Sequence, residues 1–374
     1  MCFDLQSFRI RYCLFLATLV VYPFCDPSLG ICQTSSLSQA GPSAPPVLLQ
    51  MIRDDLVHQD LGLTGAQRDS LREVLLQVDG RWFRARNLPA AKQQQELTAL
   101  TALLRQRLAA FFSDTQMTRL DQLERQALGT RMLMLNKTAK LLGVSEEEQK
   151  RFIDAFIATD AALAEIQEKL RSGEFESDEA QRKMTALQDA ERGLLADRLT
   201  QQQRSKIGEA TGKPFDFSKV QRMYPLAPEL TTDGVTWVQG GPLKLEQLRG
   251  KVVAVHYYAY QCINCKRNLP HYTAWYADYV DKGLVVVGIQ TPETASERNF
   301  AKVKAAAQAE GIRYPVLLDG ESANWRTWSN TMWPTVYLID KEGYLRRWWQ
   351  GEMNWQGKEG EKDMRRTIEQ LLAE

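Results

Sequence analysis

The sequence predicts two folded domains of different class, an all-α helical domain followed by an α/β domain. A chain of 374 residues is long enough for two domains with separate cores. Between Pro46 and Pro214 it contains a single proline, Pro89, and apolar residues recur there at helical spacing. Beyond residue 230, where eight of the nine tryptophans lie, apolar runs alternate with helical patterns.

The composition is near the average for globular proteins. Hydrophobic residues make up 44% and charged residues 25%, and the formal net charge is +1. A nearly neutral chain lacks the basic excess that drives bulk binding to nucleic acid. We therefore expect no nucleic-acid partner.

The first 30 residues are typical of an export signal. Arg9 and Arg11 precede the apolar run 12–24, and Ser28 and Gly30 are small residues suited to cleavage after Gly30. The run is short for a membrane span, which needs about 20 residues. The sequence predicts an extracytoplasmic protein, periplasmic or secreted. Whether the segment 1–30 is cleaved or kept as an N-terminal membrane anchor stays open.

A linker and the helical domain follow. Residues 31–47 are rich in Ser, Pro and Gly and are predicted to be disordered. Residues 48–213 are predicted to form five or six helices and no strands. Four segments carry Ser or Thr followed three positions later by Gln or Glu, a pattern that caps a helix start. They are "LTGAQ" from Leu63, "FSDTQ" from Phe112, "VSEEEQ" from Val144 and "LTQQQ" from Leu199, and they predict two copies of a unit with two capped starts each.

These motifs resemble the L-T-x-x-Q helical proteins of the bacterial periplasm, of the Spy and CpxP type. The resemblance covers about 160 residues, 50–212, and implies an extracytoplasmic location. Proteins of this type act in envelope stress, chaperoning or metal sensing. His58 is the only histidine of the region, so a metal-sensing role has no evident ligands. We expect the helical domain to hold protein clients or to set the oligomeric state.

The α/β domain is expected at residues 231–374, after a linker at 214–230. Residues 231–245 are predicted to form two short strands joined by a Gly turn. The further strands are expected at 251–259, 284–290, 314–319, 335–340 and 345–351, and the helices at 265–280, 296–311 and 361–374.

Two cysteines two residues apart, Cys262 and Cys265, follow a buried strand and open a helix. Unpaired N–H groups and the helix dipole favour a thiolate on the first cysteine. The second lies one turn inward, where it could attack a mixed disulfide. The arrangement predicts a working dithiol. Further along, Pro334 directly precedes a buried strand, which suits a cis peptide bond facing the dithiol, with Trp333 as an apolar wall.

From about Leu243 to Gly351 the sequence resembles thioredoxin-fold thiol–disulfide oxidoreductases of the TlpA type, and especially the thioredoxin-like domain at the C-terminus of DipZ proteins. The matching segments are "LEQLRGKVVAVHYYAYQCINCKRNLP", "TPE", "GIRYPVLLD", "NWRTWSNTMWPTVYLIDKEGYLRR" and "GE", in family order.

The resemblance assigns roles to individual residues. It implies Cys262 as the attacking thiol, Cys265 as the resolving thiol and Pro334 as the cis-proline. The substrate is then expected to contact Trp333, Thr335 and Tyr260. Expected partners are proteins with disulfides or dithiols and an electron-donor protein of the membrane or periplasm, and no cofactor is expected.

Two positions depart from the family pattern. His256 stands where thioredoxins carry a buried acid, and Asn268 stands where TlpA-type reductases often carry Glu. Our hypothesis is that His256 shuttles protons for the resolving thiol, with a neutral imidazole packed on Tyr257 or Tyr258 as the alternative. Glu293 is a further candidate base.

Three other functions remain as alternatives. A zinc site would have at most Cys262, Cys265 and His271, whereas zinc takes about four ligands. A peroxiredoxin-like peroxidase usually has Thr where this chain has Ala259. In the third alternative the thioredoxin-like domain is inert with a structural disulfide, and the helical domain acts as a binding or scaffold module. The direction of electron flow is open.

Overall fold

The computed structural model describes residues 44–374. The predicted export signal, most of the predicted linker and four of the six cysteines lie outside these residues. The chain divides into two compact units. Within the described residues, the first comprises 44–78 and Leu88–Met223, and the second comprises Asp79–Asn87 and Tyr224–Glu374.

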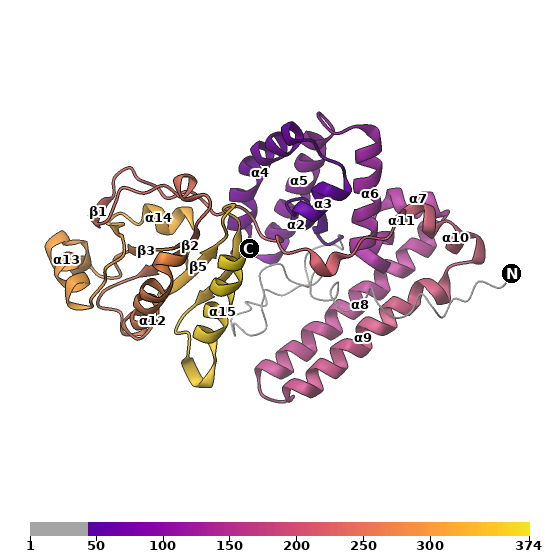
Figure 1. The fold of residues 1–374 in the computed structure, drawn as a ribbon. Helices are drawn as coiled ribbons and strands as arrows, with labels where there is room; N and C mark the ends of the chain where they lie inside the picture. The colour runs from indigo at the N-terminus through magenta and orange to yellow at the C-terminus, as the bar shows by residue number, and fades with distance from the viewer. Residues whose placement is uncertain (1–43) are drawn as a thin grey trace. The chain divides into compact units, whose positions relative to one another are not determined.

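The first unit is helical, and no strand lies among residues 44–223 (Figure 1). Five long helices correspond to the five or six that the sequence predicts, whereas five further helices have only five to seven residues, too few to display a helical repeat. The α-helices are α2 (Val47–Met51), α3 (Asp55–Asp60), α4 (Gly65–Ala85), α5 (Ala90–Leu108), α6 (Asp114–Leu128), α7 (Asn136–Leu142), α8 (Glu146–Arg171), α9 (Ser177–Arg198), α10 (Gln201–Ser205) and α11 (Ile207–Thr211). A 3₁₀ helix, Gly129–Met134, joins α6 to α7.

All four predicted helix caps are present. Ser113, Ser145 and Thr200 each cap a helix through a reciprocal capping box with the residue three positions later. Thr64 caps α4 in the same way, because its hydroxyl accepts the N–H of Gln67 (3.2 Å) and its own N–H donates to the Gln67 side chain (3.0 Å).

The caps also contact one another in pairs. The side-chain amide of Gln67 donates to Gln116 Oε1 (2.8 Å), which joins the first cap to the second. Gln203 donates to Glu148 Oε2 (3.4 Å), which joins the fourth cap to the third. This pairing agrees with a duplicated unit, and the duplication itself stays a prediction.

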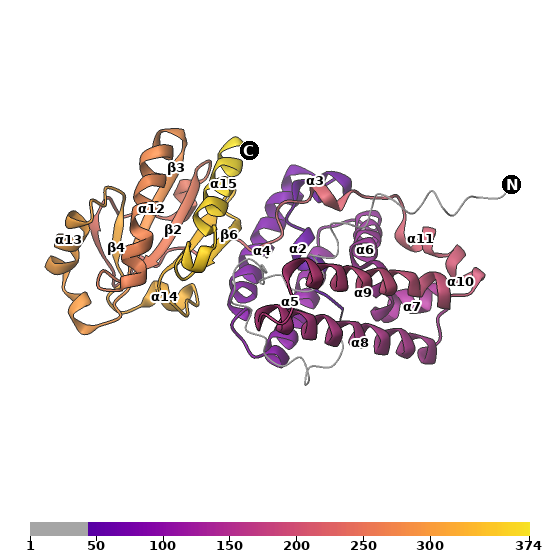
Figure 2. The ribbon, with the colours of Figure 1, turned by 90° about the horizontal axis from the view of Figure 1, so that it is seen from below.

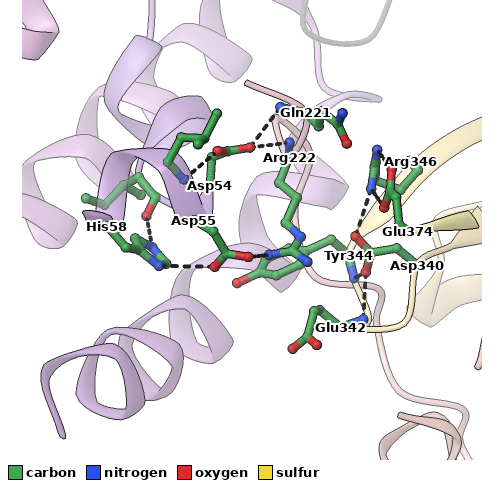
Figure 3. Close-up of polar contacts among 12 residues, drawn as sticks. Asp54, Asp55, His58, Gln221, Arg222, Asp340, Glu342, Tyr344, Arg346 and Glu374 are labelled. Atoms are coloured by element: carbon green, nitrogen blue, oxygen red, sulfur yellow. Dashed lines mark hydrogen bonds and ion pairs between the residues drawn. The ribbon is translucent and has the colours of Figure 1, made fainter. Parts of the chain in front are cut away.

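The start of α3 is tied to the end of the first unit's chain (Figure 3). The Asp54 carboxylate caps α3 through Leu56 N (2.9 Å) and also accepts the backbone N–H groups of Gln221 (2.8 Å) and Arg222 (3.0 Å). The Arg222 guanidinium pairs with Asp55 (2.6 Å). One carboxylate therefore satisfies three N–H groups from two distant segments.

The second unit is built on a six-stranded mixed sheet in the order β1-β4-β3-β2-β5-β6. Strands β2, β3 and β4 run parallel, whereas β1 pairs antiparallel with β4, β5 with β2, and β6 with β5. This is a thioredoxin-like sheet. The strands are β1 (Thr236–Gln239), β2 (Val252–Tyr258), β3 (Leu284–Gln290), β4 (Val316–Leu318), β5 (Thr335–Ile339) and β6 (Leu345–Gln350).

Every residue of β2 is buried because both faces of the sheet are covered. On one face His256 stacks on Tyr272 of α12 (Ile263–Tyr279), and α15 (Gly360–Ala373) lies beside α12 (Figure 2). On the other face Tyr257 meets Trp325 of α14 (Ala323–Thr327), and Phe83 from the segment 79–87 packs on Trp328. Since successive side chains alternate across a strand, this arrangement separates His256 from Tyr257.

The turn between β5 and β6 is held by Asp340 (Figure 3). One oxygen of its carboxylate accepts the N–H groups of Glu342 (3.0 Å) and Tyr344 (2.9 Å). The other pairs with Arg346 (3.2 Å), which also pairs with the C-terminal residue Glu374 (2.8 Å).

Two predicted elements of this unit are wrong. Residues 231–245 contain one strand, β1, instead of two, because the chain turns through Pro242, which lacks the N–H that a ladder requires. The expected helix 296–311 is two helices, a 3₁₀ helix Ala295–Arg298 and α13 (Phe300–Ala309). The side chain of Asn299 accepts the N–H of Lys302 (3.0 Å) and so begins α13 afresh.

Candidate active site

The two cysteines lie where the central strand passes into α12. The N–H of Cys262 donates to Ala259 O (3.1 Å), which closes a tight turn after β2. Cys262 is the N-cap of α12, and its carbonyl accepts the N–H of Lys266 (3.0 Å). Cys262 is half-exposed, Cys265 is buried, and both are free thiols. The structure thus has the strand–turn–helix arrangement that the spacing predicts.

The surroundings push the pKa values of the two thiols in opposite directions. The Cys265 thiol donates a hydrogen bond to Cys262, and together with the N–H groups of Cys265 and Asn264 it lowers the pKa of Cys262 to about 7. The same hydrogen bond, together with burial, raises the pKa of Cys265 well above its usual range. Near neutral pH the half-exposed Cys262 is therefore partly a thiolate, whereas the buried Cys265 holds its proton.

Side chains from the end of β3 and from the segment that follows it hold the turn that carries Cys262. Gln290, the last residue of β3, accepts the N–H of Tyr260 (2.9 Å). Glu297 is fully buried, and its carboxylate accepts the N–H groups of Gln261 (2.8 Å), Glu293 (2.7 Å) and Thr294 (2.9 Å). The backbone directly before Cys262 is thereby fixed to two polar side chains.

The strand β5 begins beside the end of β2. Thr335 lies opposite Tyr257 in the register, so Pro334 lies at the sheet edge from which the Cys262 turn departs. The Trp333–Pro334 peptide bond is cis, as predicted. Trp333 is half-exposed and its indole N–H donates to Thr291 O (3.1 Å).

The residues expected to contact substrate differ in exposure. Trp333 and Tyr260 are half-exposed, and Trp333 stacks on Trp325 with ring centroids 3.9 Å apart. Thr335 and Pro334 are buried, and the Thr335 hydroxyl donates to Met332 O (2.8 Å). Only Trp333 and Tyr260 therefore expose side-chain surface that a substrate could contact. The substrate-binding roles of these residues stay predictions.

His256 is fully buried in an aromatic setting. Its ring stacks on Tyr272 (4.2 Å) and contacts Tyr258 (5.1 Å) and the edge of Tyr314 (5.4 Å). A Cβ on Gly288, the residue opposite on β3, would lie 3.0 Å from His256 Nε2, so glycine makes room for the ring. Burial alone lowers the pKa of His256 to about 3, and the imidazole is neutral at neutral pH. Its role as a proton shuttle stays a prediction.

Two other residues that the sequence analysis singled out, the candidate base Glu293 and the family departure Asn268, lie near the cysteines. The exposed Glu293 carboxylate acts on both thiols, raising the pKa of Cys262 and of Cys265 through its charge. Asn268 is buried one turn after Cys265, and its side chain makes three hydrogen bonds. Among residues 44–374 no three His, Cys, Asp or Glu side chains gather as a metal site requires.

Sequence reasoning missed Gln290 and Glu297. A weak signal existed for each. Gln290 is a polar residue that ends an apolar strand, and Glu297 stands three positions after Thr294, which is the spacing of a capping box. That box is present, and the same carboxylate reaches on to the cysteine turn.

Comparison with known proteins places the second unit among thioredoxin-like domains. Residues 226–348 match the model of the AhpC/TSA family. The chain is 44% identical over 124 residues to Protein DipZ of Mycobacterium tuberculosis, which is 32% of this chain and 18% of DipZ. The chain thus spans less than a fifth of that relative.

Shorter relatives are matched over most of their length. The thiol-disulfide oxidoreductase YkuV of Bacillus subtilis is 26% identical over 147 residues, 39% of this chain and 94% of YkuV. A thiol-disulfide isomerase structure from Corynebacterium glutamicum is 23% identical and covers 40% of this chain and 97% of its own, with a TM-score of 0.35.

Among residues 44–374 no helix has both the length and the apolar character that a membrane crossing requires.

The fold and the comparisons together show that the described part of the chain consists of a helical region followed by a thioredoxin-like domain. This domain is related in sequence to DipZ and to thiol–disulfide oxidoreductases.

Proposed function

We propose that this protein is an exported thiol–disulfide oxidoreductase that exchanges disulfides with protein substrates through Cys262 and Cys265. The observation that carries the proposal is the contrast between the two thiols, one half-exposed with a pKa lowered to about 7 and one buried with a raised pKa. A nucleophile needs the first property, and a resolving thiol that must wait for the mixed disulfide needs the second.

The exchange proceeds in two steps. The Cys262 thiolate attacks one sulfur of a substrate disulfide, forming a mixed disulfide and releasing the other substrate sulfur as a thiolate. Once Cys262 is in a disulfide, Cys265 no longer donates its proton to a thiolate. Cys265 then loses this proton and attacks the Cys262 sulfur, which frees the second substrate thiolate. The substrate gains two electrons from the dithiol, and its two thiolates are protonated by the proton from Cys265 and by one proton from water. The protein is left with a Cys262–Cys265 disulfide. The same steps in reverse oxidise a substrate dithiol.

The cycle requires a redox partner. After substrate reduction, a dithiol donor must return two electrons to the protein, and we propose an electron-donor protein of the membrane or periplasm. The predicted export signal and the relatedness to DipZ support an extracytoplasmic setting, where such donors act. The helical unit is proposed to hold clients or to set the oligomeric state.

Trapping the mixed disulfide tests the proposal. The Cys265→Ala variant, mixed with a protein that contains a disulfide, should accumulate a covalent adduct through Cys262 that a reductant releases. Cys262→Ala is the matched control and should give none. Equal adduct from both variants, or none from either, would contradict the mechanism.

A thiol peroxidase is the second candidate, because the family that matches residues 226–348 is AhpC/TSA. In that case Cys262 would be oxidised by hydrogen peroxide to a sulfenic acid and then form the disulfide with Cys265, releasing water at each step. Peroxide consumption faster than exchange with a protein disulfide would favour this candidate.

A further inference from the structure

The buried side-chain amide of Asn268 links α12, the helix that carries Cys265, to the chain segment that follows β6. Asn268 is 1% exposed and lies on α12 three residues after Cys265. Its Nδ2 donates to Gly351 O (3.0 Å) and to the Tyr272 hydroxyl (3.3 Å). Its Oδ1 accepts the N–H of Met353 (3.1 Å). Both ends of the amide are used, which fixes its orientation.

The segment that Asn268 holds is in turn bonded to the proline loop. The N–H of Gly351, whose carbonyl binds Asn268, donates to Pro334 O (2.7 Å). A continuous path of hydrogen bonds therefore runs from α12 through Gly351 to Pro334. Pro334 lies at the sheet edge from which the Cys262 turn departs. The path joins the helix of the dithiol to the Trp333–Pro334 loop.

A second link between the same two segments lies at the surface. Arg267, the neighbour of Asn268, pairs with Glu352 (3.0 Å), and about half of the Arg267 side chain is exposed (49%). Exposed ion pairs contribute little, whereas a buried amide with all its partners satisfied holds its neighbours firmly. The connection between α12 and residues 351–353 thus depends chiefly on Asn268.

We infer that Asn268 is a positioning residue that fixes the Trp333–Pro334 loop relative to Cys262. This positioning matters only for substrates that are long enough to contact the loop. The inference rests on the proposed function. Its substrate class is a polypeptide disulfide, because only a chain that extends beyond the reacting sulfurs reaches the loop. A small disulfide needs only the two thiols and no contact with the loop.

Steady-state kinetics with two substrates test the inference in the full chain. With insulin as the protein disulfide and a dithiol reductant, Asn268→Ala should raise KM at least fivefold. With dipyridyl disulfide the rate should stay within twofold of the parent protein, and so should the pKa of Cys262 measured by pH-dependent alkylation. Arg267→Ala, the matched control on the same helix, should change neither substrate's kinetics by more than twofold.

The variant Asn268→Asp supplies a second readout, the pH dependence of KM. It also keeps the proposal testable if Asn268→Ala does not fold. When its carboxyl is protonated, the introduced aspartate can still donate a hydrogen bond to Gly351 O. When the carboxyl is ionised, it has no proton to donate and repels the carbonyl oxygen of Gly351. The KM for insulin should therefore rise with pH through the pKa of the introduced carboxyl, and the parent protein should show no such step. Unchanged KM for insulin in a folded Asn268 variant, or an equal loss on both substrates, would overturn the inference.

Failure of the proposed function gives a different pattern. In that case the parent protein itself would reduce neither insulin nor dipyridyl disulfide. The positioning role would then be judged by hydrogen exchange at the Gly351 amide, which should be at least tenfold faster in Asn268→Asp than in the parent protein. Equal exchange rates would overturn it.

Discussion

The carboxylate of Glu297 accepts the backbone N–H of Gln261, the residue directly before Cys262, at 2.8 Å. The contact joins the segment after β3 to the turn that carries the half-exposed Cys262. A buried carboxylate that accepts three N–H groups is a strong local constraint, because each donor would otherwise be left without a partner away from water.

Replacing Glu297 with Gln should therefore destabilise the protein by about 2–3 kcal/mol. The amide offers one acceptor oxygen, and its NH₂ group meets a backbone donor. Denaturant unfolding measures the change, with the exposed Glu321→Gln as a control expected within about 0.5 kcal/mol of the parent protein. Equal stability of the two variants would show that the three hydrogen bonds contribute nothing.

Removing the thiol of Cys265 should raise the pKa of Cys262. The Cys265 S–H stabilises the Cys262 thiolate, so its loss favours the protonated form and moves the pKa from about 7 toward the ordinary thiol value of about 9. Cys265→Ala should show the full effect and Cys265→Ser, which keeps a donor, a smaller one. The rate of iodoacetamide alkylation against pH gives both values. A midpoint that stays near 7 in Cys265→Ala would contradict the assigned cause.

Removing the charge of Glu293 should act in the opposite direction. This carboxylate raises the pKa of Cys262, so Glu293→Gln should lower that pKa, and the difference should shrink in high salt because the group is exposed. The same alkylation profile at two salt concentrations measures it. A higher pKa in the variant would be the wrong sign for a direct electrostatic effect.

Arg86 should contribute to the stability of the second unit. Its guanidinium lies over the Phe83 ring (3.6 Å to the centroid) and donates to Tyr337 Oη (3.1 Å) and to the carbonyls of Trp328 and Ser329. Arg86→Ala should cost about 2 kcal/mol in denaturant unfolding. The exposed Arg84→Ala on the same segment is the matched control. A cost as small as that of Arg84→Ala would mean that these contacts are not stabilising.

The hydrophobic pattern was sufficient to predict four of the six strands closely, and the long helices. Strands β2, β3 and β5 are mostly apolar runs buried in the sheet, and β6 combines buried apolar residues with half-buried Arg and Gln side chains. The positions of these four strands agree with the prediction to within one residue at either end. Helix caps were predictable because a capping box is a local pattern. The assignment of residues 79–87 to the second unit was not predictable. Helix α4 has one continuous helical pattern in the sequence, and only tertiary contacts assign its C-terminal end to the second unit.

The candidate site was predictable in its chemistry and less so in its support. The cysteines and the cis-proline stand in a recognisable local pattern. Glu297 reaches the cysteine turn through the backbone N–H of Gln261, 36 residues away, and no local pattern records that contact. For Asn268 the sequence marked the position as unusual, but its hydrogen bonds to residues 351 and 353 depend on how the chain returns after β6.

A redox titration of the purified protein, read by thiol alkylation and mass at Cys262 and Cys265, tests the central claim most directly. The account predicts one reversible two-electron transition within the range of thioredoxin-fold couples, about −270 to −120 mV. A pair that stays oxidised below about −300 mV would behave as a structural disulfide and would contradict a catalytic dithiol.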